Sequence, residues 1–297
     1  MEQTQQEKQK SWYDKYYKIL LFIPVVILIL SLIYLGIFFS QHKDFILKDT
    51  SLSGGTTITL NTEVDSEKLE SSLKQKFPDV SIRKLTNIRT GESIALIIET
   101  SSKPEEIKPE IENILGYKLT EKNSSIEFAG STLSQGFYKQ LIFALIISFI
   151  LMSIVIFVLF RTFIPSMAVI FAAFSDIVMP LALIDYFGIK LSAAGIAAFL
   201  MLIGYSVDTD ILLTTRALKK KEGLLNERIF GAFKTGILMT ITALISVLPA
   251  FFIVSGLPDS FRQIFLILAL GLSADIINTW LTNAGIIKWY CDKKGIR

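Results

Sequence analysis

Five charged side chains lie within or at the end of long apolar runs in the C-terminal half of this 297-residue chain. Asp176 and Asp275 fall near the middle of two runs, whereas Asp208, Asp210 and Arg216 fall toward the end of a third. A charge at membrane depth is costly, so an ionisable residue there marks a functional site by default. Carboxyl groups in such positions can carry protons or bind cations, and the sequence therefore predicts a polar route for ions.

Polar residues at helical spacing accompany Asp275. Thr279 and Asn283 follow it at intervals of four residues, and Asn278 lies beside them. Residues four apart share one face of a helix, so this polar stripe must face the protein interior or water. The alternative is that the stripe only joins neighbouring helices through hydrogen bonds, each worth roughly 1 kcal/mol.

A proline follows Asp176 by four residues. Pro180 has no N–H, so the carbonyl of Asp176 loses its usual helical hydrogen bond. A freed carbonyl and a carboxyl at the same depth suit a proton or cation site. The alternative is a structural aspartate that hydrogen-bonds a neighbouring helix.

Spacing gives neither Asp208 nor Asp210 a basic partner on its own helix. Asp208 and Arg216 share a helical face, but two turns separate them by about 12 Å. We expect these three residues to form the inner mouth or gate of the polar route, below the pair Asp176 and Asp275. Ordinary charges at a helix end are the alternative.

The composition favours a membrane protein. Hydrophobic residues make up 51% of the chain, and its mean hydropathy is +0.51. The single cysteine, Cys291, excludes an intrachain disulfide, and the single histidine, His42, cannot build a multi-histidine metal site. The chain contains no G-x-x-x-x-G-K-[ST] phosphate loop. We therefore expect no metal, no cofactor, no enzymatic activity and no nucleic-acid partner.

Two changes in character divide the chain. Residues 1–18 are polar, and residues 19–39 carry no charge over a length that spans a bilayer. This run is longer than the apolar part of a signal peptide, and no typical cleavage site follows it, so we predict an uncleaved first transmembrane helix. Residues 40–139 are charged and contain no spanning segment.

Residues 40–139 alternate between strand and helix patterns. The predicted strands are 55–60, 80–86, 93–99 and 125–129, and the predicted helices are 65–77 and 104–115. The order strand-helix-strand-strand-helix-strand is that of a small ferredoxin-like α+β domain.

Five further apolar helices follow within residues 140–290, which brings the predicted total to six. They cover 141–160, 163–187, 191–213, 235–254 and 263–288. The loop 216–234 is basic, and its Leu225, Ile229 and Phe233 share a helical face, which predicts an interfacial amphipathic helix.

Basic residues predict the orientation. The N-terminus, the loop 216–234 and the tail 291–297 are rich in lysine and arginine, so the positive-inside rule places them in the cytoplasm. The domain 40–139 is then extracytoplasmic. We predict a multi-pass protein of the cell membrane, surrounded by membrane lipids.

One small external domain after the first of six helices resembles the half-unit of the resistance-nodulation-division transporter superfamily. Within it, residues 204–210, Gly-Tyr-Ser-Val-Asp-Thr-Asp, resemble the G-Y-S-x-x-D segment of the SecF family and include Ser206. Arg216 stands where that family has the arginine of D-R-I, and Gly54 and Gly55 resemble its D-F-x-G-G motif. Residues 175–176 resemble its H-D pair, and 275–280 and 283–290 resemble its archaeal branch.

This resemblance implies a partner of SecD in a twelve-helix complex beside the SecYEG translocon. Such a complex acts on unfolded preproteins and assists their export. In bacterial members the work is coupled to the proton gradient, and the aspartate that matches Asp176 is implicated in the proton route. The sequence leaves open whether H⁺ or Na⁺ is used here.

Three other functions share parts of this pattern. A superfamily exporter of lipids or small molecules would have the same carboxylates, but usually two halves in one chain. A translocon scaffold would need no ion route. An intramembrane aspartyl protease would use Asp176 and Asp275, but the G-x-G-D and P-A-L motifs are missing, so we reject it.

Overall fold

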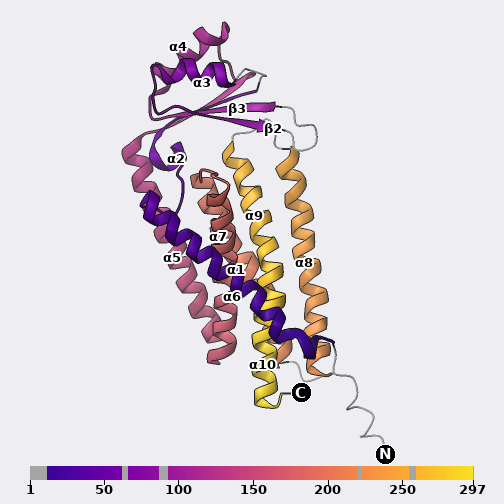
Figure 1. Ribbon diagram of the computed structural model, residues 1–297. Coiled ribbons are helices and arrows are strands. Elements are labelled where there is room, and N and C mark those ends of the chain that lie inside the picture. Colours follow the sequence, from indigo (N-terminus) through magenta and orange to yellow (C-terminus); the bar gives the residue numbers. More distant parts are fainter. Residues whose placement is uncertain (1–11, 62–65, 87–92, 220–222, 254–258, 297) are drawn as a thin grey trace, which may run out of the picture.

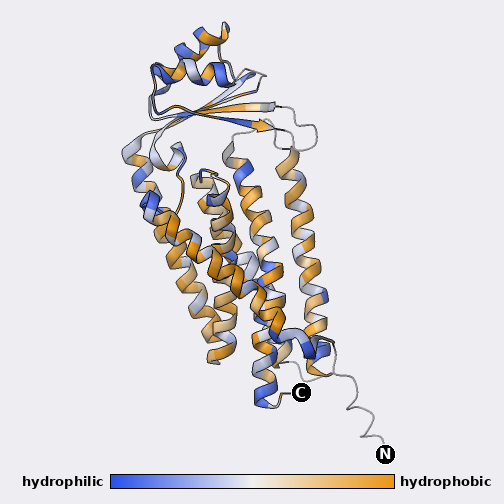
Figure 2. Ribbon diagram, in the orientation of Figure 1, coloured by the Kyte–Doolittle hydropathy of each residue, from blue (hydrophilic) through white to orange (hydrophobic). Residues whose placement is uncertain are grey.

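The computed structural model of the protein describes residues 12–61, 66–86, 93–219, 223–253 and 259–296. A long helical bundle carries a small sheet domain at one end, and α1 begins and α10 ends at the other end (Figure 1). Apolar residues cover most of the bundle surface, whereas polar residues concentrate in the sheet domain and near the termini (Figure 2).

Six helices of the described part are long and apolar enough to span a membrane, which confirms the predicted number. Except for the third span, each helix extends beyond its predicted apolar segment at one end or both, because helical structure continues into the polar residues that follow. The first five are α1 Trp12–His42, α5 Ser131–Phe160, α6 Phe163–Tyr186, α7 Ala193–Lys219 and α8 Leu225–Ile253. The sixth span joins α9 Asp259–Ile277, the π-helix η1 Asn278–Asn283 and α10 Ala284–Lys294.

The helices differ in how deeply they are buried. In the most apolar stretch of α6 and α7, 61% and 56% of residues are buried, compared with 6% in α5 and 11% in α8. The sixth span is intermediate, at 50%. The polar residues singled out in the sequence therefore sit on the three most central spans.

The sheet domain has the predicted ferredoxin-like order. Its elements are β1 Gly55–Leu60, α3 Ser66–Lys74, β2 Ser81–Thr86, β3 Ser93–Thr100, α4 Pro104–Leu115 and β4 Ser124–Ala129. The strands form one antiparallel sheet in the order β2-β3-β1-β4. Leu69 and Leu73 of α3 and Ile107 and Ile111 of α4 pack against it in one core. The predicted helix 65–77 starts at a residue outside the described part.

The predicted interfacial helix in the loop 216–234 is wrong. Its residues form the first turns of α8, which continues without a break into the membrane span. Leu225 and Ile229 are buried in a core that includes Ala217 and Ile287. The apolar face that sequence periodicity assigned to the bilayer surface packs against other helices instead. Lys220 and Lys221 of this loop lie outside the described residues.

Candidate functional site

Three aspartates meet inside the bundle. Asp176 of α6, Asp210 of α7 and Asp275 of α9 each have no exposed surface. Their helices approach closely because small residues lie at the contacts. A Cβ added to Gly271, one turn before Asp275, would come within 2.3 Å of the Leu202 side chain on α7.

Asp176 accepts two hydrogen bonds. The Ser206 hydroxyl of α7 donates to its Oδ2. The amide of Asn278 donates to its Oδ1 at 2.7 Å. Pro180 is also buried one turn later, and α6 runs through it as one helix. Asp176 is therefore bonded to both α7 and η1.

Asp210 and Asp275 share one hydroxyl. The Thr279 Oγ1 lies 2.9 Å from Oδ1 of Asp210 and 2.9 Å from Oδ1 of Asp275. A hydroxyl has a single proton, so it can donate to only one of the two carboxylates at a time. A proton on either carboxyl would let that group donate to Thr279 while Thr279 donates to the other. The geometry is therefore that of a short proton relay.

Further donors complete this cluster. Thr209 donates to Asp275 at 2.9 Å, and Asn283 donates to Asp210 at 2.7 Å. Thr240 of α8 lies 3.3 Å from the second oxygen of Asp275. The three aspartates form one carboxyl cluster with Ser206, Thr209, Thr240, Asn278, Thr279 and Asn283.

The carboxyl cluster has no positive partner in the described residues: no lysine, arginine or histidine nitrogen there lies within 4.0 Å of these carboxylates. Three bare negative charges in an apolar bundle would be very costly. Protons or a cation must therefore neutralise part of the charge. Also among the described residues, no three Asp, Glu, His or Cys side chains are placed to hold a metal ion.

The structure separates the residues predicted to form an inner mouth. Asp210 belongs to the buried cluster, whereas Asp208 is exposed on the surface of α7. Residues two positions apart on an α-helix point roughly 200° apart around its axis, so Asp208 and Asp210 cannot face the same way. Arg216 donates to the Gly231 carbonyl at 2.5 Å and ties α7 to α8. The prediction of one group formed by all three is therefore wrong.

Sequence reasoning missed two members of the carboxyl cluster. Thr209 lies one turn after Ser206, so the spacing of three residues could have identified it. Thr240 gave no such signal, because most of its neighbours on α8 are exposed and it is buried only by tertiary contact.

Gly54 and Gly55 stand where the chain enters the sheet domain. Gly54 has φ +92°, and a Cβ there would lie 2.3 Å from the Cα of Ser131, the first residue of α5. Gly55 has φ +130°, and a Cβ there would lie 2.2 Å from the Thr100 carbonyl oxygen. Only glycine fits this crossing of the entering and leaving chains. The Gly-Gly motif is therefore a structural junction.

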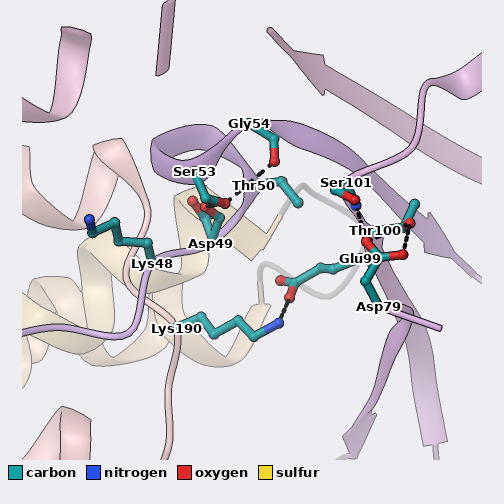
Figure 3. A pocket seen from close by; sticks show the side chains of 10 residues that line it. All are labelled: Lys48, Asp49, Thr50, Ser53, Gly54, Asp79, Glu99, Thr100, Ser101 and Lys190. Atoms are coloured by element: carbon teal, nitrogen blue, oxygen red, sulfur yellow. Dashed lines mark hydrogen bonds and ion pairs between the residues drawn. The ribbon is translucent and has the colours of Figure 1, made fainter. Parts of the chain in front are cut away.

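A polar pocket of about 230 Å³ lies at the same junction (Figure 3). Glu99 of β3 points into it, has a side chain only 4% exposed, and pairs with Lys190 from the loop between α6 and α7. Arg83 of β2 contacts the other Glu99 oxygen at 2.6 Å. The Lys190 carbonyl in turn accepts from Gln263 of α9 at 2.9 Å. An ion pair thus joins the sheet domain to the helices that carry the carboxyl cluster.

Asp49 lies in the linker beside this pocket and caps the short helix α2 Thr50–Ser53, which the sequence did not predict. Its Oδ1 accepts from the Ser51 amide at 2.9 Å and from the Ser51 hydroxyl at 2.6 Å. Burial, with a smaller contribution from nearby Glu99, raises the pKa of Asp49 to about 7.

The fold defines a class of protein: a multi-pass membrane protein with six spans and one ferredoxin-like domain after the first span. The family model for the protein export membrane protein SecD/SecF, C-terminal, matches residues 111–293. SecF of Methanocaldococcus jannaschii is 38% identical over 283 residues, which cover 93% of this chain and 96% of the relative. SecF of Methanolacinia petrolearia is 39% identical, with coverage of 92% and 93%. The chain belongs to the SecF family of protein-export membrane proteins, as its motifs predicted.

A solved structure shares the fold. The crystal structure of SecDF from Thermus thermophilus, described as a translocon-associated membrane protein, matches with a TM-score of 0.73 at 16% identity. The match covers 95% of this chain and 39% of that one, so this chain spans about two fifths of the SecDF polypeptide.

The pKa of Asp49 predicts a pH-dependent stability. A carboxyl whose pKa is higher in the folded than in the unfolded state stabilises the fold at low pH, and this contribution is lost between about pH 4 and pH 7. In that window, the free energy of unfolding of the wild type should fall with rising pH by up to about 1.4 kcal/mol per pH unit because of Asp49. We expect Asp49→Asn to remove this fall. Thermal unfolding of the purified protein at pH 5 and pH 8 measures it. Identical pH dependence in both proteins would contradict the assignment.

The ion pair between Lys190 and Glu99 predicts how firmly the sheet domain is held against the bundle. Lys190→Met leaves Glu99 with Arg83 alone and removes the ion pair between the sheet domain and the bundle. We expect a broader distance distribution between spin labels at Ser71→Cys in α3 and Leu183→Cys in α6, measured by pulsed electron resonance in a Cys291→Ser background.

Lys74→Met is the matched control. It breaks an exposed pair with Glu70 inside α3, at 2.6 Å, and leaves the junction intact. Exposed pairs contribute little, so this variant should keep the original distribution. A Lys190→Met distribution as narrow as that of the control would show that the ion pair does not hold the domain.

Proposed function

We propose that this protein is an accessory subunit of the Sec protein-export machinery that assists preprotein translocation and is driven by an ion gradient. The SecF relatives, which match more than nine tenths of the chain, support the export role. The observation that carries the ion coupling is the buried carboxyl cluster, with hydroxyl groups between its acids and no described positive partner.

The proposed mechanism starts from the shared Thr279 hydroxyl. A proton that enters at one aspartate reverses the direction of the hydrogen bond and passes to the other. The charge of each carboxylate then changes, and the donors from α7, α8 and η1 rearrange around it. A proton suits this relay because every link is an oxygen at hydrogen-bond distance.

The same rearrangement can reach the sheet domain. The loop between α6 and α7 links the helices of Asp176 and Asp210, and its Lys190 pairs with Glu99 of the domain. Helix movement at the carboxyl cluster would displace this loop and, through the ion pair, the domain. We infer that the domain moves against the emerging preprotein in this way.

We propose a SecD-type second half as the partner, acting beside a SecYEG-type translocon. The stripe of α7 formed by Met201, Gly204, Tyr205 and Asp208 is exposed, although α7 is otherwise a central helix. A Cβ at Gly204 would meet no atom within 4 Å. An aspartate that faces hydrocarbon is costly, and a small residue permits close helix packing, so a second protein suits this stripe better than lipid.

Charge supports the proposed orientation. Exposed basic residues lie near the start of α1, the end of α7, the start of α8 and the end of α10. They include Lys15, Lys18, Lys219, Lys234, Lys293 and Lys294. In Figure 1, α1, α8 and α10 reach the end of the bundle that is far from the sheet domain. The positive-inside rule then places both termini in the cytoplasm and the sheet domain outside.

Ion coupling predicts a specific loss in Asp210→Asn. With SecD-type partner and translocon in vesicles, an uncoupler should slow preprotein translocation several-fold for the wild type. Asp210→Asn cannot exchange a proton with Thr279, so its translocation should already be slow and should not respond to the uncoupler. Replacing Na⁺ by K⁺ should change the translocation rate of neither the wild type nor Asp210→Asn.

Asp292→Asn provides the control, since it removes an exposed carboxyl from the same transmembrane segment that carries Thr279. It should keep the full uncoupler response. An Asp210→Asn protein that responds to the uncoupler like the wild type would favour the scaffold function over ion coupling. Sensitivity to Na⁺ instead of the uncoupler would assign the coupling to Na⁺.

The exposed stripe of α7 predicts a defect in partner binding, not in ion coupling, for variants of Asp208, which lies two residues before Asp210. Asp208→Asn, or Gly204→Leu, should lower copurification with the SecD-type partner several-fold, whereas Asp210→Asn should retain it. Affinity purification of the tagged partner measures this. Equal recovery of all three variants would remove the stripe as the partner surface.

A further inference from the structure

A second cavity, of about 460 Å³, lies near the start of α1, and α1 begins at the end of the bundle away from the sheet domain (Figure 1). Its walls come from α1, α8, η1 and α10, and they are mostly apolar. The side chains that matter for its chemistry are Tyr13, Leu20, Ile229, Phe230, Phe233 and Trp280. The volume falls in the range of about 300–1,000 Å³ that is usual for pockets that bind small molecules.

Two polar atoms in this apolar wall lack partners. The Tyr13 hydroxyl and the Trp280 indole N–H are buried and have no hydrogen-bond partner among the described residues. Buried tyrosine and tryptophan usually find one. An occupant with an apolar chain would fill the cavity, and oxygen acceptors on it would give both groups a partner once their side chains turn toward it.

One exposed lysine and one buried, ion-paired lysine lie beside the cavity. Lys234, one turn from the lining residue Phe230, places its ammonium 5.7 Å from that ring and is itself exposed. Lys288 donates to the lining residue Asn226 at 2.9 Å and pairs with Asp14 at 2.5 Å. Basic pockets between transmembrane helices suit anionic lipid head groups.

We propose that this cavity binds one anionic membrane lipid. Its hydrocarbon chain lies along Leu20, Ile229 and Phe233, its glycerol-region oxygens accept from Tyr13 and Trp280, and its head group lies near Lys234. A protein helix is a poorer occupant, because a cylinder 10–12 Å wide would place only about one turn in this volume.

The site borders the carboxyl cluster. Trp280 directly follows Thr279, so the lipid and the two aspartates contact different faces of the same π-helix. π-Helical segments are rare and depend on their surroundings. A bound lipid therefore stabilises η1 in the form that bonds Asp210 and Asp275. This site stands independently of the proposed export function.

Tryptophan quenching tests the site in the full-length protein. Trp12→Phe and Trp289→Phe leave Trp280 as the single tryptophan, because the chain contains three. Vesicles of phosphatidylcholine then receive small fractions of brominated phosphatidylglycerol or brominated phosphatidylcholine. We expect the anionic lipid to quench Trp280 several-fold more strongly at equal fraction, although only 6% of this side chain is exposed.

Two pairs of variants locate the binding. Leu20→Phe, which narrows the cavity, should weaken quenching, whereas Ile23→Phe on the outer surface of α1 should not. Lys234→Gln should reduce the preference for the anionic lipid, whereas Lys293→Gln at the same end should retain it. The preference should survive in Asp210→Asn, which separates this result from the export function.

Several outcomes would overturn the proposal. Absence of quenching by either lipid would show that no lipid chain reaches Trp280 and would favour a protein segment as the occupant. Equal quenching by both lipids would show ordinary contact with the bilayer. Equal effects of Leu20→Phe and Ile23→Phe would place the quenching outside the cavity.

Discussion

The structure depends on the burial of three carboxyl groups without a basic partner among the described residues. Asp176, Asp210 and Asp275 are each fully enclosed, and hydroxyl and amide donors from three spans, α7, α8 and the sixth, compensate their desolvation. This requirement explains why α6, α7 and the sixth span occupy the centre, since these three carry the acids. The helices α1, α5 and α8 are the more exposed ones. An arrangement of this kind is stable only if protons or a cation balance the charge, and that dependence is what makes it suitable for ion coupling.

The π-helix η1 serves several contacts that lie in different directions. Asn278 bonds Asp176 of α6, while Thr279 and Asn283 bond Asp210 of α7. Trp280, between them, forms part of the apolar cavity. The wider π turn changes the angular spacing of neighbouring side chains relative to an α-helix, and such segments are frequent at functional sites. A conformational change in η1 would therefore alter the hydrogen bonds to the aspartates and the shape of the cavity together.

The sheet domain is attached to the bundle by few contacts, and each has a distinct role. Gly54 and Gly55 allow the entering chain to cross the start of α5 and the end of β3 without a steric clash. The pair between Lys190 and Glu99 adds an electrostatic link to the loop between α6 and α7. Because glycines restrict the path of the chain while an ion pair can break and re-form, the domain can change its position without losing its connection. Such a junction allows helix movement to be passed on to the sheet domain.

The sequence by itself determined the six spans, the ferredoxin-like order and the family, because apolar length, periodicity and short motifs are local properties of the chain. It also identified the three aspartates, since a charge within an apolar run is visible without a structure. The tertiary structure decided which of them meet: Asp210 points inward, whereas Asp208, two residues before it, points outward. It also added Thr240 and turned the expected interfacial helix into the start of α8. The physical reason is that the rotation of each helix about its own axis is set by its neighbours, and those contacts join residues that are far apart in the chain.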